Sequence, residues 1–125
     1  MKLFFAVLIL GLFACSKRFG CHDAAAQSSR AYYLSPSGRD DNEGTVNSPW
    51  QTLKKINSIR LQPGDSVLLE GGSRFPGTLQ PDSASRGTAS APIFIGSYGN
   101  GHAIISAGND SAMVCYKNSY LVIKN

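Results

Sequence analysis

The residue types best suited to chemistry in this chain are four consecutive polar residues, Asp40-Asp41-Asn42-Glu43. Carboxylate and amide oxygens are the ligands that Ca²⁺ prefers, so this acidic run is a candidate cation site. It lacks the spaced ligand pattern of a known calcium loop, and the same side chains also cap turns and helices. The sequence favours the second role, with the helix expected after Ser48 as the element that is capped.

The other candidate side chains are isolated from one another in the sequence. His102 stands between a Gly-marked turn and an apolar segment, without a neighbouring Ser or Asp, which favours a solvated turn residue. Arg74 and Arg86 lie in a long loop, where an exposed position is favoured over contact with an anionic ligand. Lys54 and Lys55 are expected on the solvent-exposed face of a helix. No catalytic set is assembled from these residues, and the catalytic residues stay unknown.

The N-terminus carries a short apolar run, Leu3–Ala14, preceded by Lys2. The run is too short for a membrane span, which needs about 20 residues. A charged start, a short apolar core and small residues after it are typical of a secretory signal. We therefore expect a signal peptide over 1–14 and an exported protein.

Two processing sites compete after this leader. Leu12-Phe13-Ala14-Cys15 resembles a bacterial lipobox, in which the Cys thiol receives a diacylglycerol, whereas Ala24-Ala25-Ala26 suits a general signal peptidase. The position of Cys15 directly after the apolar core favours lipidation there. Residues 15–30 would then be a polar tether, and the acyl chains would anchor the protein in a membrane, the outer membrane being the expected one. The protein would be a cell-surface or periplasmic lipoprotein, with free secretion as the alternative.

The remaining cysteines leave two readings open. Export permits a disulfide between Cys21 and Cys115. The alternative, a buried free thiol at Cys115 with an unpaired Cys21, is favoured, and the spacing of the cysteines does not suggest zinc.

The predicted folded part is residues 31–125, long enough for a single domain. It contains eight basic and seven acidic residues, so most of the net charge of +4 belongs to the leader and the tether. The basic residues do not gather on one face, and we expect no nucleic-acid partner. The oligomeric state is not predicted.

One short amphipathic helix is expected near the start of this domain. Ser48 is a suitable N-cap and Pro49 suits the first helical position. Trp50, Leu53 and Ile56 follow at a spacing of three and define an apolar stripe, which Leu61 closes. The pattern predicts two to three helical turns lying on an apolar surface.

Short strands follow the turn at Pro63-Gly64-Asp65. After Pro92 they recur at short, regular intervals, separated by Gly- and Asn-rich turns, and no second helix intervenes. This spacing is typical of a sandwich, a barrel or a β-solenoid, and a lone helix before the first strands favours the solenoid, whose open end needs a cover. Strands are expected at 32–35, 66–70, 93–95, 103–105, 113–116 and 121–123.

Several segments, taken together and in this order, resemble a known group of proteins. YYLSPSGRDDNEGTVNSPWQTLKKIN, LQPGDSVLLEGG, PIFIGSYGNG and AIISAG are similar to the N-terminal segment of secreted right-handed parallel β-helix proteins of the pectate-lyase-like group. The resemblance covers residues 32–125. It implies an all-β fold, the start of a right-handed parallel β-helix with one N-terminal capping α-helix, and an incomplete solenoid.

The resemblance also assigns roles to the apolar residues. Trp50, Leu53 and Ile56 would seal the end of the solenoid, and Asn125 would lie at a turn where such folds often stack Asn side chains. The inward-facing stacks would contain Val67, Leu69, Ile93, Ile95, Ile104, Leu121 and Ile123.

The function that the resemblance implies is action on polysaccharide, as a lyase or a glycoside hydrolase. In relatives the catalytic residues lie on later coils, so none is carried over to this chain. Ca²⁺ is a cofactor to expect in a full-length lyase. The apolar strand at the end of the sequence favours a piece of a longer protein, and a non-enzymatic glycan-binding or adhesin module is the alternative.

Overall fold

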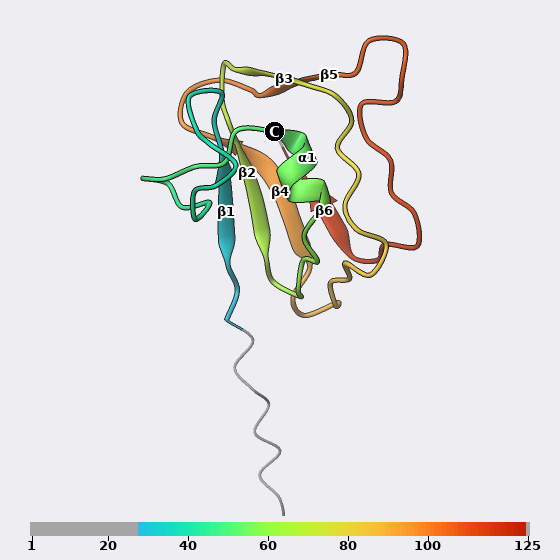
Figure 1. Ribbon diagram of the computed structural model, residues 1–125. Coiled ribbons are helices and arrows are strands. Elements are labelled where there is room, and N and C mark those ends of the chain that lie inside the picture. The colour runs from blue at the N-terminus through green and yellow to red at the C-terminus, as the bar shows by residue number, and fades with distance from the viewer. Residues whose placement is uncertain (1–27, 125) are drawn as a thin grey trace, which may run out of the picture.

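The computed structural model describes residues 28–124, which form one short helix and six short strands (Figure 1). The predicted signal peptide, Cys15, Cys21 and Asn125 lie outside the described residues. The elements, in chain order, are β1 Ala31–Leu34, α1 Leu53–Asn57, β2 Ser66–Glu70, β3 Arg74–Pro76, β4 Ile93–Tyr98, β5 Ile104–Ser106 and β6 Leu121–Ile123.

All strand pairs in residues 28–124 are parallel, and from β2 onward the chain alternates between two sheets. One sheet has the order β1-β2-β4-β6, and the other consists of β3 and β5. Val67 pairs with Ile95 and Ile95 with Ile123; since 95 minus 67 and 123 minus 95 both give 28, the same position recurs every 28 residues. A third set of parallel contacts has a longer spacing, because Leu79 forms a parallel bridge with Met113 and 113 minus 79 gives 34. The fold is therefore all-β, as the sequence predicts.

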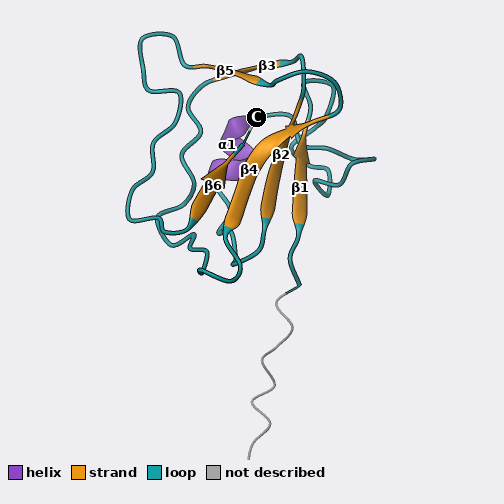
Figure 2. Ribbon diagram, turned by 180° about the vertical axis from the view of Figure 1, so that it is seen from behind, coloured by secondary structure: helices purple, strands orange, loops and turns teal. Residues whose placement is uncertain are grey.

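The helix lies on one face of the four-stranded sheet. In Figure 1, α1 stands in front of β4, and β3 and β5 run above it. Seen from behind, the sheet lies in front of the helix (Figure 2). Leu53 and Ile56 of α1 are 2% and 1% exposed. The predicted apolar surface beneath the helix is thus the inner face of this sheet.

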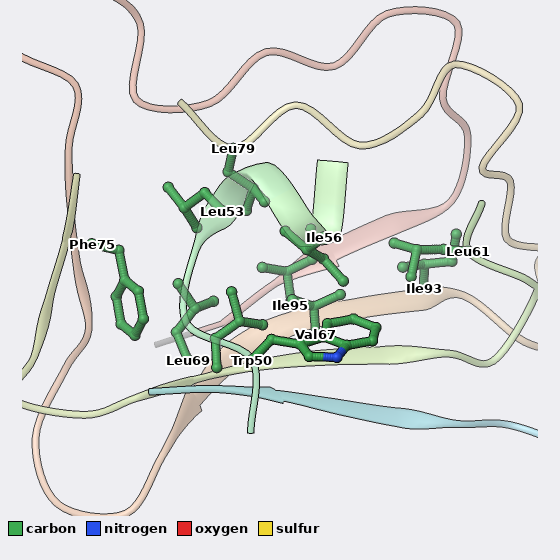
Figure 3. Close-up of a cluster of buried hydrophobic side chains, with 11 residues drawn as sticks. Trp50, Leu53, Ile56, Leu61, Val67, Leu69, Phe75, Leu79, Ile93 and Ile95 are labelled. Carbon is green, nitrogen blue, oxygen red and sulfur yellow. The ribbon is translucent and has the colours of Figure 1, made fainter. Parts of the chain in front are cut away.

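The core lies between α1 and the inner faces of both sheets (Figure 3). Alternate residues of β2 and β4 point inward, which gives the period of two expected of a half-buried strand. The buried apolar residues are Leu34, Trp50, Leu53, Ile56, Leu61, Val67, Leu69, Phe75, Leu79, Ile93 and Ile95.

The helix is shorter than predicted and begins later. It contains five residues, and Thr52 is the N-cap in place of Ser48. Trp50 precedes the helix and is extended, because its backbone forms a parallel β-bridge with Leu34, the last residue of β1. Its side chain is nevertheless 5% exposed, as the apolar stripe predicts.

The strands differ from the prediction at three places. Ile104 is 48% exposed, and its neighbour Ile105 packs against the core instead. The segment 113–116 is not a strand and keeps only the bridge at Met113. The prediction missed β3, whose Phe75 is 1% exposed.

Two of the predicted inward residues lie at the edge formed by β6. Leu121 is half-buried and packs against the core. Ile123 is 60% exposed, although its register with Ile95 gives it the inward direction. Orientation was therefore predictable, but burial depends on what lies beside the strand.

The turn at Pro63-Gly64-Asp65 is tied to both neighbouring passes of the chain. Asp65 is 1% exposed, and its carboxylate accepts hydrogen bonds from the backbone N–H of Arg30 at 2.9 Å and of Gln62 at 2.8 Å. Its carbonyl accepts from the N–H of Phe94 at 2.9 Å. A buried carboxylate needs such partners, so Asp65 fixes the entry into β1, β2 and β4 together.

Candidate functional site

The acidic run at residues 40–43 serves the backbone. One oxygen of the Asp40 carboxylate accepts the N–H groups of Gln51 and Thr52 at 3.0 and 2.9 Å, and the other accepts the Thr52 hydroxyl at 2.5 Å. Asn42 donates its side-chain amide to the carbonyl of Pro49 at 2.9 Å. Asp41 lies outside this network and forms an exposed ion pair with Arg39. Asp40 therefore holds the segment that leads into α1, whereas the N-cap of the helix itself is Thr52.

Removing the Asp40 carboxylate should destabilise the protein in a pH-dependent way. Burial acts to raise the pKa of Asp40, but the hydrogen bonds from Thr52 and Gln51 and the charge of Lys55 outweigh it, so the pKa lies below its usual value. A depressed pKa in the folded state gives stability that is present above the unfolded-state pKa of about 4 and is lost as the pH falls through the folded-state pKa. We expect Asp40→Ala to cost about 1–2 kcal/mol at pH 7. Urea titrations at pH 7 and pH 2.5 should show that difference shrinking, whereas the exposed control Asp41→Ala should change little at either pH.

A second polar cluster lies where β1 and β2 end. The buried hydroxyl of Ser35 donates to Oε2 of Glu70 at 2.7 Å, and the Ser73 hydroxyl donates to the same oxygen at 3.2 Å. Burial and then the charge of Glu70 raise the pKa of Tyr98. The carboxylate of Glu70 therefore joins the ends of β1 and β2, and both of its partners in these hydrogen bonds are serine hydroxyls.

The basic candidates are spread over the surface. Arg74 is exposed and donates to the Ser106 hydroxyl at 3.2 Å. Arg86 and His102 are exposed, and the backbone carbonyl of His102 accepts the N–H of Gly72 at 3.0 Å. Lys54 lies on the solvent-exposed face of α1, as predicted. These basic side chains therefore lie on separate elements and do not form one cationic site.

Lys55 and Cys115 differ from the predictions in detail. The ammonium of Lys55 lies 5.3 Å from the ring centroid of Trp50. Lys55 is half-buried, whereas full exposure was predicted. Cys115 is a free thiol, but it is exposed, which corrects the expectation of a buried one. The segment around it is a loop, and the apolar run AMVCY does not enter a strand there.

The side chains that could hold a metal ion are dispersed over the described part of the chain. Within residues 28–124, His, Cys, Asp and Glu side chains do not gather in threes or more as a metal would require. Asp40, Asp65 and Glu70 each accept hydrogen bonds from backbone N–H groups or hydroxyls. Within residues 28–124, the helix that is present lacks the length and apolarity needed to cross a membrane.

A polar hollow on the outer surface was not predicted. It has a volume of about 360 Å³ and joins three separate stretches: the end of α1, the segment after Leu79 and the segment after Met113. No local pattern could reveal it, since the stretches meet through long-range contacts: the parallel bridge of Leu79 with Met113 and the hydrogen bonds of the Asn57 and Asn118 side chains. Its lining residues are Asn57, Gln80, Pro81, Asp82, Ser83 and Tyr116.

Comparison with known proteins finds relatives that are named as glycan-active enzymes. The chain is 45% identical over 93 residues to a lacto-N-biosidase of Bifidobacterium longum, a match that covers 70% of this chain and 6% of that protein. It is 33% identical over 78 residues to pectate lyase PEL9 of Emericella nidulans, covering 62% of this chain and 18% of the lyase. No family model matches the sequence.

The fold is also found in solved structures. A crystal structure of the GH136 lacto-N-biosidase of Eubacterium ramulus matches with a TM-score of 0.64 and 32% identity, covering 75% of this chain and 19% of that one. The native form of the same enzyme gives a TM-score of 0.59. The chain thus spans between 6% and 19% of the length of these relatives.

Proposed function

We propose that this chain forms the N-terminal end of a right-handed parallel β-helix that acts on glycans. The observation that carries the proposal is the match to the lacto-N-biosidase structure, at 32% identity over 75% of this chain. The parallel register that repeats every 28 positions, 95 minus 67 and 123 minus 95, supports the solenoid. Each turn would contribute β2, β3 and the Leu79 segment, or their counterparts in the next turn.

The segment containing α1 closes the first turn in this proposal. Asn57 donates to the carbonyl of Thr78 at 2.8 Å and accepts the N–H of Gln80 at 2.8 Å. The N–H of Leu61 donates to the Ser85 hydroxyl at 2.9 Å. These bonds join the helix to the third side of the turn, while Leu53 and Ile56 fill its interior.

The two named relatives support a reaction type for this proposal. Identity to the lacto-N-biosidase is higher than identity to the pectate lyase PEL9. This difference favours a glycoside hydrolase over a lyase. Hydrolysis of a glycosidic bond needs a pair of carboxylates about 5–10 Å apart. We place that pair in later turns of a longer polypeptide, because the described carboxylates that are buried or half-buried, Asp40, Asp65 and Glu70, are each used for structure.

The test is an assay of the native polypeptide, captured from its source with an antibody against residues 28–124. Release of lacto-N-biose from a neutral oligosaccharide is the expected result. Formation of an unsaturated uronate from polygalacturonate would replace the hydrolase by a lyase. Binding of either glycan without cleavage would favour a non-enzymatic binding module. The absence of both binding and cleavage would overturn the proposal.

We also propose export and a lipid anchor at Cys15. The leader and the lipobox-like Leu12-Phe13-Ala14-Cys15 support this. Mass spectrometry of the mature protein should find an acylated N-terminal Cys15, and Cys15→Ser should release the protein from membranes. An unmodified N-terminus at Gln27 would contradict the anchor and leave a secreted protein.

A further inference from the structure

The polar hollow beside α1 has fixed walls. Both ends of the Asn57 side-chain amide are used, on the carbonyl of Thr78 and the N–H of Gln80. The N–H of Ala84 donates to the Asp82 carboxylate at 2.7 Å. The backbone on two sides of the hollow is therefore held in place by side-chain hydrogen bonds.

The third wall presents an exposed tyrosine on a backbone that is tied to the second wall. Tyr116 is 59% exposed, and its N–H donates to the side-chain oxygen of Asn118 at 3.0 Å. The amide nitrogen of Asn118 donates to the carbonyls of Asp82 and Ser85, both at 2.9 Å. Asn118 thus sets the position of Tyr116 relative to Asp82.

The loop that carries Tyr116 has an unfavourable backbone conformation. Lys117, the next residue, has φ 58° and is not a glycine. Non-glycine residues in this conformation are strained and gather at functional sites. The hydrogen bonds of Asn118 maintain this conformation, which keeps Tyr116 at the surface.

The groups around the hollow suit an uncharged polar ligand. The side chains of Gln80 and Ser83 are exposed and make no hydrogen bond within the described residues, so they are available as donors and acceptors. Asp82 brings one negative charge and Lys117, whose ammonium lies 5.2 Å from the Tyr116 ring centroid, brings one positive charge. A uronate would need an excess of cations, which this balance does not provide.

We infer that the hollow is a subsite for one sugar of a neutral glycan. An aromatic side chain with a polar end offers an apolar surface to the C–H face of a pyranose. Tyr116 lines the hollow and would do so with the ring face that the Lys117 ammonium does not cover. Gln80, Ser83 and the free oxygen of Asp82 would bind the hydroxyls. The ligand class rests on the proposed function, whereas the site rests on the geometry.

The test uses the full 125-residue chain and amide chemical-shift titrations with lacto-N-biose, cellopentaose and oligogalacturonate. We expect shifts at residues 80–83 and 116–118 with a neutral glycan. Tyr116→Ala and Gln80→Ala should each weaken that binding at least tenfold. Tyr120→Ala, which removes an equally exposed tyrosine outside the hollow, should change it less than twofold.

The urea midpoints of all three variants show whether each is folded, and Gln80→Glu repeats the test on a variant of almost unchanged shape. Binding of oligogalacturonate alone, shifts that lie elsewhere, equal effects of Tyr116→Ala and Tyr120→Ala, or no binding of any glycan would overturn the inference. If the native polypeptide nevertheless cleaves glycans, only the subsite fails. If it neither binds nor cleaves them, the proposed function fails as well.

Discussion

Replacing Trp50 by alanine should lower the free energy of unfolding by about 3–5 kcal/mol, as for other buried aromatic residues. The indole is 5% exposed and stacks on Tyr32, with ring centroids 5.1 Å apart. Its Nε1–H donates to the carbonyl of Asn42 at 2.7 Å. The substitution would leave a cavity and an unpaired carbonyl at the junction of β1 and the segment before α1.

Urea unfolding followed by circular dichroism measures this loss. Trp50→Phe keeps an aromatic ring against Tyr32 and should lose less, which gives a graded value even if the alanine variant unfolds. Val46→Ala, in the same loop and 54% exposed, is the control and should stay within about 0.5 kcal/mol of the wild type. A loss below about 1 kcal/mol for Trp50→Ala would show that the indole is not part of the core.

Phe75→Ala should cost a similar amount, about 3–5 kcal/mol, through the loss of the largest side chain on β3. Phe75 is 1% exposed and is paired in register with Ile105 of β5. Its ring lies at one edge of the buried cluster, on the side of Leu69 (Figure 3). The second sheet therefore depends on this residue for its attachment to the first.

A matched control lies on the outer side of the same sheet. Ile104 of β5 is 48% exposed, so Ile104→Ala should change the free energy of unfolding by no more than about 0.5 kcal/mol. Phe75→Leu, which retains apolar volume, should fall between the two. Comparable losses for Phe75→Ala and Ile104→Ala in urea titrations would be incompatible with the assigned inner and outer faces.

The helix shows where local sequence signals predict correctly and where they fail. The spacing of Trp50, Leu53 and Ile56 predicted burial correctly, because each residue contacts the core whether or not it is helical. The cap at Ser48 was wrong, because the Asp40 carboxylate holds Gln51 and Thr52 and the bridge to Leu34 keeps Trp50 extended. Contacts between residues about ten or more positions apart override the local cap.

The same distinction explains the strands and the surface site. β3 is three residues long and ends in Pro76, so its own composition does not indicate a strand, and only its pairing with β5 shows it. The choice between Ile104 and Ile105 depends on which face of β5 turns inward, which a three-residue segment leaves open. The hollow combines Asn57, Gln80 and Tyr116, which lie too far apart in sequence for any local pattern to join them.

The most direct test of the central claim is a set of backbone nuclear Overhauser effects measured on the full chain. A parallel solenoid start predicts contacts between Val67 and Ile95 and between Ile95 and Ile123, together with contacts from the Trp50 indole to the ring of Tyr32. Cross-strand contacts with the antiparallel pattern, or an indole that contacts only solvent, would contradict the architecture and the proposals that depend on it.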